Sequence, residues 1–188
     1  MGKIIKFPFF KDKKESAPDN LLVELVNLTK SGNNDSKIIK LLSSKSTKNN
    51  PVAIPYTPQA ITKDLKVIRM YISQYAPSDS EIANLIAIQM LHRPIKGTSN
   101  IVIEAGYSTI PADKVIFMGT FCTAQKTLME FTDTEITRYT ISTCCDKRVC
   151  EKCKKMDGKS FSVAKAVVGK NLPPFCDSCR CVILPKFK

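Results

Sequence analysis

The sequence contains no tryptophan, a single histidine and no apolar run of the roughly 18 residues that a membrane-spanning helix needs. The missing apolar run excludes a transmembrane protein. His92 is the only imidazole, and its place at a predicted helix end, beside Arg93-Pro94, gives it no catalytic role. Lys3, Lys6 and Lys11 interrupt the first apolar residues, so the amino terminus does not resemble a secretory signal peptide.

Acidic residues are scarce as well, because 17 Asp and Glu stand against 29 Lys and Arg, for a formal net charge of +12. Residues 147–188 alone hold eleven bases and three acids, a formal +8. This excess favours a polyanionic partner such as DNA, contacted through its phosphates, although a lysine-rich surface also serves solubility alone. The basic side chains that we expect at any nucleic-acid surface are Lys147, Arg148, Lys152, Lys154, Lys155 and Lys159.

Cysteines, in contrast, are plentiful and concentrated near the carboxy terminus, where seven of the eight lie between residues 144 and 181. Two Cys-x-x-Cys pairs stand out, and each such turn directs two thiolates towards one point, so two pairs supply the tetrahedral shell that Zn²⁺ favours. In a chain without an export signal, thiols stay reduced, which favours a metal over disulfides, a redox dithiol or an iron–sulfur cluster. The predicted ligands are Cys150, Cys153, Cys176 and Cys179, with Cys181, Cys145 and Cys144 as alternates.

The solitary Cys122 is expected to be a small buried apolar residue. A catalytic role for the clustered thiols would need a nearby base, and His92 lies more than fifty residues away in another predicted region. Four thiolates would also leave a zinc ion without an open position for substrate. The residues therefore predict no catalytic site, no enzyme and no small-molecule substrate.

The first half of the chain has helical periodicity. Capping boxes are predicted at Ser16–Asp19 and Ser78–Glu81, and Thr57-Pro58 is a second type of helix start. Apolar residues follow each of these signals, and Lys37–Leu42 predicts a further short helix. The residues that step along the strongest helix are Ile61, Leu65, Ile68, Ile72 and Tyr75.

From about residue 100 the pattern changes to short β-branched runs. Ile101–Glu104 and Val115–Met118 predict strands, Thr123–Phe131 a short helix, and Ile136–Thr143 a strand that leads into the cysteines. The expected class is α+β, with a helical amino-terminal half and a small β-containing, zinc-stabilised carboxy-terminal domain. The expected organisation is a mobile leader (1–15), a helical region (16–98) with a linker near 43–58, and a β-containing zinc-knuckle domain (99–188).

The segment 136–181 carries a specific order of motifs. Asp146-x-Arg148-x-Cys150-x-x-Cys153 is followed by Met156-Asp157-Gly158-Lys159, then by a hydrophobic stretch, and finally by Pro173-Pro174-Phe175-Cys176-x-x-Cys179-Arg180-Cys181. Asp157-Gly158 predicts a tight turn. The Arg180 guanidinium is expected to pair within the chain, with Asp146 or Asp157, rather than with a phosphate of a partner.

This order and spacing resemble the carboxy-terminal domain of the phage head-morphogenesis family, the minor head proteins similar to the F protein of phage Mu. That family has a histidine at the position of Cys176, and exchanging one zinc ligand for another preserves coordination. The resemblance implies a non-enzymatic minor head protein, associated with portal or capsid proteins, located in the virion or in the host cytoplasm. Its basic surface would lie near packaged DNA. The alternative is a zinc-dependent nucleic-acid-binding or regulatory protein outside the virion.

Overall fold

The fold was obtained as a computed structural model, which describes residues 21–32, 34–45, 57–91, 95–144 and 146–187. The predicted leader, the capping box at Ser16–Asp19, residues 46–56 of the predicted linker, His92 and Cys145 lie outside the described residues. None of the described helices combines the length and the apolar character that crossing a membrane requires.

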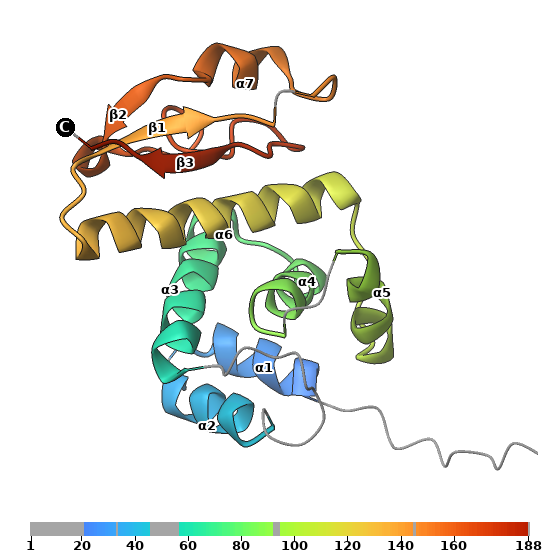
Figure 1. The fold of residues 1–188 in the computed structure, drawn as a ribbon. Helices are drawn as coiled ribbons and strands as arrows, with labels where there is room; N and C mark the ends of the chain where they lie inside the picture. The colour runs from blue at the N-terminus through green and yellow to red at the C-terminus, as the bar shows by residue number, and fades with distance from the viewer. Residues whose placement is uncertain (1–20, 33, 46–56, 92–94, 145, 188) are drawn as a thin grey trace, which may run out of the picture.

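Five helices form a layer below the long helix α6 in the view of Figure 1. Helix α3 starts as predicted, because the Thr57 hydroxyl accepts a hydrogen bond from Ala60 N and Pro58 takes the first helical position. Helix α4 starts with the predicted capping box, in which Ser78 and Glu81 bond each other's backbone N–H groups. The helices of this layer are α1 (Leu21–Lys30), α2 (Asp35–Lys45), α3 (Pro58–Tyr75), α4 (Asp79–Gln89) and α5 (Ile95–Glu104).

Two of the strand predictions are wrong. Residues 101–104 lie in helix α5, and residues 115–118 lie in helix α6 (Ala112–Asp133), which also contains the predicted short helix at Thr123–Phe131. Short apolar runs with β-branched residues do not distinguish a strand from a buried helix. The helical spacing becomes visible only over the full length of α6, where the buried side chains are Val115, Met118, Phe121, Cys122, Ala124, Gln125 and Phe131.

Beyond α6 the chain forms a small antiparallel sheet of three strands in the order β2-β1-β3. The strands are β1 (Arg138–Ser142), within the predicted run at Ile136–Thr143, β2 (Ser160–Ser162) and β3 (Val182–Pro185). Helix α7 (Glu151–Met156) and the short 3₁₀ turn η1 (Val163–Lys165) lie in the connections. The α+β class, with helices first and a small sheet last, is thus confirmed.

Helix α6 separates two hydrophobic cores, with the helical layer on one side and the sheet on the other (Figure 1). Met118, Phe121 and Cys122 belong to the helical core, whereas Ala124 and Phe131 belong to the core beneath the sheet. Cys122 is fully buried, as predicted, and burial raises its pKa to about 12. Because both faces of α6 are covered, the cysteine-containing unit packs against a helix that is held in place by the helical layer.

Candidate metal centre

The first Cys-x-x-Cys pair is built around the start of α7. Cys150 is the N-cap residue, and its Sγ accepts a hydrogen bond from Cys153 N at 3.4 Å. A side chain that caps a helix satisfies one of the backbone donors left free in the first turn. The same contact aims the Cys150 sulfur at the side of the helix on which Cys153 lies, so local helix geometry brings the two thiols together.

The second pair is held by the body of the protein. Residues 172–175 before it are buried, and Cys179 N donates to Cys176 O at 3.0 Å to close the turn. The Cys179 carbonyl accepts a hydrogen bond from the Thr120 hydroxyl of α6 at 2.6 Å. Residues 59 positions apart are therefore tied together, and this anchor was not visible in the sequence because Thr120 lies in no recognisable motif.

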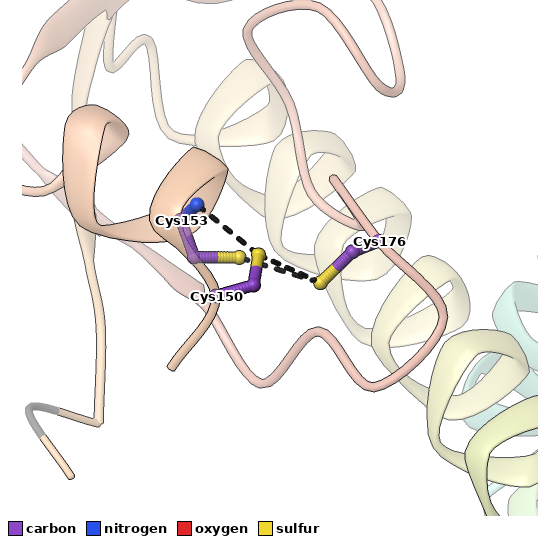
Figure 2. A group of neighbouring side chains, drawn as sticks. All are labelled: Cys150, Cys153 and Cys176. Carbon is purple, nitrogen blue, oxygen red and sulfur yellow. Dashed lines mark hydrogen bonds between the residues drawn. The ribbon is translucent and has the colours of Figure 1, made fainter. Parts of the chain in front are cut away.

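Sulfur atoms of the two pairs lie close together, and Figure 2 draws three of them, those of Cys150, Cys153 and Cys176. Cys150 and Cys176 Sγ are 3.1 Å apart, Cys153 and Cys176 Sγ are 3.7 Å apart, and Cys153 and Cys179 Sγ are 3.7 Å apart. With zinc–sulfur bonds of about 2.3 Å, tetrahedral geometry separates thiolates by about 3.8 Å. None of the seven described cysteines is in a disulfide. Three of the thiols, those of Cys150, Cys153 and Cys176, lie within 4.8 Å of one another and could hold a metal ion.

A fifth thiol also reaches the cluster. Cys153, Cys179 and Cys181 form a second group whose sulfur atoms lie within 4.8 Å of one another, alongside the group of Cys150, Cys153 and Cys176. Cys153 belongs to both groups and is therefore the central thiol. The predicted ligands are thus divided between two groups: Cys150, Cys153 and Cys176 form one, and Cys153 and Cys179 form the other with the alternate Cys181. Cys144 is exposed, and its thiol donates to Arg180 O at 3.4 Å.

Hydrogen bonding within the cluster separates the acidities of its thiols. A hydrogen bond from Cys181 lowers the pKa of Cys179 to about 5, and the same bond raises the pKa of Cys181. The backbone N–H of Cys153 lowers the pKa of Cys150, whereas burial raises the pKa of Cys176 to about 11. The thiolate is the form that binds a metal, and two thiols here are stabilised in that form by their surroundings.

An ion pair braces the cluster from outside. Arg180 donates to both carboxylate oxygens of Asp146 at 2.7 and 2.6 Å, which confirms the predicted internal partner of Arg180. This fork holds the pKa of Asp146 well below its usual range, at about 2. The predicted turn is present too, since Gly158 has φ of 72° and the Asp157 carboxylate accepts a hydrogen bond from Thr143 N at 2.9 Å.

All six basic residues predicted for a nucleic-acid surface are exposed around α7. Two of them are in ion pairs, Lys154 with Glu151 at 2.7 Å and Arg148 with Asp146 at 3.6 Å. Within the part of the chain that the structure describes, the other four have no ion-pair partner: Lys147, Lys152, Lys155 and Lys159. Their positive charge is therefore open to solvent.

The centre described above is a cluster of thiols that could hold a metal ion, carried on a small sheet. Residues 118–184 match the family described as Phage Mu protein F like protein, which confirms the resemblance read from the cysteine motifs over part of the chain. The matched segment begins inside α6 and ends in β3, so it starts earlier than residue 136. No curated protein and no solved structure matches the chain.

Proposed function

We propose that this protein is a non-enzymatic minor head component of a phage or prophage, incorporated beside the portal or the inner capsid surface. The observation that carries the proposal is the match of residues 118–184 to the Phage Mu F-like family, which includes the entire thiol cluster and nearly all of the three strands. Proteins of this family are head-morphogenesis proteins, and their role is structural.

We further propose that the cluster holds one structural Zn²⁺ ion through Cys150, Cys153, Cys176 and Cys179. Bound there, the ion would cross-link the start of α7 to the loop before β3. Cys150, Cys153 and Cys176 would hold the ion as one group of neighbouring thiols. Cys179, whose Sγ lies 3.7 Å from that of Cys153 and whose carbonyl is tied to α6 by Thr120, would be the fourth ligand. Four thiolates leave no site for substrate, which supports a structural role.

The zinc proposal is tested by metal analysis of reduced protein purified without chelators. We expect one zinc per chain, and Cys150→Ser or Cys176→Ser should abolish it. Cys144→Ser is the matched control, because Cys144 is exposed and belongs to neither group of three thiols. Unmodified protein that contains no zinc would contradict the proposal.

The head role is tested separately, by probing purified virions of the phage or the induced prophage for this protein. Presence at a constant copy number per particle supports it. A portal or terminase gene beside this one would add independent support.

The exposed lysines around α7 favour one other candidate, a zinc-dependent nucleic-acid-binding or regulatory protein that acts in the host cytoplasm. Strong, salt-dependent DNA binding by a protein absent from virions would favour this candidate over the head component.

A further inference from the structure

The outward face of the sheet carries a second group of basic and hydroxyl side chains, separate from those around α7. In β1 the side chains of Tyr139 and Ile141 are buried in the core, so the alternating residues Arg138, Thr140 and Ser142 lie on the opposite face. In β3 Ile183 is buried and Leu184 is 49% exposed, which places Leu184 on the same outward face as Thr140, its cross-strand partner.

Two cations are neighbours on this face. The N–H of Lys186 donates to the carbonyl of Arg138 at 3.0 Å, which extends the register that pairs Tyr139 with Pro185 by one residue. Both side chains are exposed. Like charges directly opposite each other on a sheet are destabilising. Among the residues that the structure describes, no carboxylate lies within ion-pair distance of either cation.

Hydroxyl groups surround the pair. The Lys186 side chain crosses the face of β1, since its Nζ donates to the Ser160 hydroxyl of β2 at 3.1 Å. Ser160 and Thr140 hydroxyls are 2.9 Å apart, and Ser162 stands opposite Arg138. Because Ser160 is neutral, it does not compensate the charge of Lys186. One side of the sheet therefore carries a guanidinium, an ammonium and three hydroxyls.

We propose that this outward face, defined by Arg138, Lys186, Thr140, Ser160 and Ser162, binds the phosphate backbone of a nucleic acid. Arginine, lysine, serine and threonine side chains are the groups that contact phosphate oxygens in protein–DNA complexes. An oxyanion bound between Arg138 and Lys186 would reduce the repulsion between these two like charges. The net charge of +12 favours a partner with many phosphates over an isolated anion.

This inference deepens the DNA contact within the proposed function and rests on it, but it assigns that contact to different residues. Its consequence is that DNA meets two surfaces, the outward face of the sheet and the lysines of α7. The two surfaces share no residue, so variants can separate them.

The test is fluorescence anisotropy of the full-length zinc-loaded protein with two unrelated short DNA duplexes over a series of salt concentrations, with poly-glutamate as a second probe. The sheet-face variant is Arg138→Gln/Lys186→Gln, and the α7 variant is Lys152→Gln/Lys154→Gln/Lys155→Gln. The matched control is Lys37→Gln/Lys40→Gln, which removes the same charge as the sheet-face variant from exposed positions of α2.

We expect the sheet-face variant to bind both duplexes about tenfold more weakly, since one hydrogen bond to a charged group is worth about a factor of ten or more. The slope of log affinity against log salt should fall by about 0.9 for each phosphate that the variant no longer neutralises. Without DNA, its melting temperature should equal or exceed that of the unmodified protein, because the repulsion is gone. A purely structural role would instead lower it.

The inference is overturned if the sheet-face variant binds DNA like the control variant. It is also overturned if that variant loses only poly-glutamate binding, which would indicate an acidic protein partner. A loss confined to the α7 variant would sustain the proposed DNA contact and reject the sheet face. A protein that binds neither duplex would reject both DNA contacts, while the head role would still be decided by its presence in virions.

Discussion

The two hydrophobic cores on either side of α6 are composed of different kinds of side chain. The helical core consists of aliphatic and aromatic residues from every helix of its layer, with Cys122 as its one cysteine. The core beneath the sheet is smaller, and three of its ten buried members are cysteines: Cys153, Cys179 and Cys181. A small core supplies little hydrophobic stabilisation, and cross-linking by a metal is a common remedy. The comparison shows an apolar core on one side of α6 and, on the other, a small core whose buried thiols could add the cross-link of a metal ion.

The largest effect should follow from breaking the thiol cluster. Cys176→Ser, or removal of the metal with a chelator, should unfold residues 144–188 locally, because structural zinc sites contribute about 10–16 kcal/mol in small zinc-binding peptides. Amides of β2 and β3 should lose protection in hydrogen exchange, while those of α3 keep theirs. If the helical layer unfolded together with residues 144–188, the two cores would not be independently stabilised.

A cavity in the helical core should lower the unfolding free energy and leave the thiol cluster intact. Leu65 is fully buried in that core, and Leu65→Ala should cost about 2–5 kcal/mol of unfolding free energy in denaturant titrations. Zinc content should stay at one per chain, because Leu65 belongs to the core on the other side of α6 from the thiols. A loss of zinc in Leu65→Ala would show that the two cores are a single cooperative unit.

The tie between the cores is the next target. Thr120→Val removes the hydrogen bond to the buried Cys179 and leaves its carbonyl unpaired, at a cost of about 1–3 kcal/mol. Because Cys179 is a proposed ligand, zinc should also be lost faster to a competing chelator. Thr123→Val changes an exposed threonine on the same helix and should leave both measurements unaltered. Equal zinc release from the two variants would show that Thr120 does not hold the second Cys-x-x-Cys pair.

The smallest effect is expected at the cap of α4. Ser78→Ala removes the side chain that accepts from Glu81 N, and N-cap losses of this kind cost about 1 kcal/mol. Thermal unfolding of the helical layer should shift slightly downward, and the sheet unit should be unaffected. A shift confined to the unit of the sheet and the thiols would contradict the assignment of α4 to the helical core.

Local signals made much of this structure predictable. The starts of α3 and α4 follow from Thr57-Pro58 and from the box at Ser78–Glu81, since the groups that form each cap are at most three residues apart. The approach of the two Cys-x-x-Cys pairs and the pairing of Arg180 with an aspartate were also predictable, because the interacting residues all belong to the same sequence motif.

What could not be predicted depends on contacts across the fold. Residues 101–104 and 115–118 contain β-branched side chains that suit a strand as well as a helix, and only the packing of the whole helix decides in favour of the helix. The tie from Thr120 to Cys179 and the neighbouring cations Arg138 and Lys186 both result from strand and helix placement, which no local pattern records.

The segment that matches the Phage Mu F-like family begins at Met118, within the second turn of a helix that continues without interruption to Asp133. The border of the matched segment is therefore not a linker. A truncation or a recombination event at that border would leave Met118, Phe121 and Cys122, all fully buried here, without the helices that cover them. Any different amino-terminal region joined to this segment would have to cover the same face of α6. The apolar face of α6, and not the cysteines, therefore decides which amino-terminal regions can be joined to the segment.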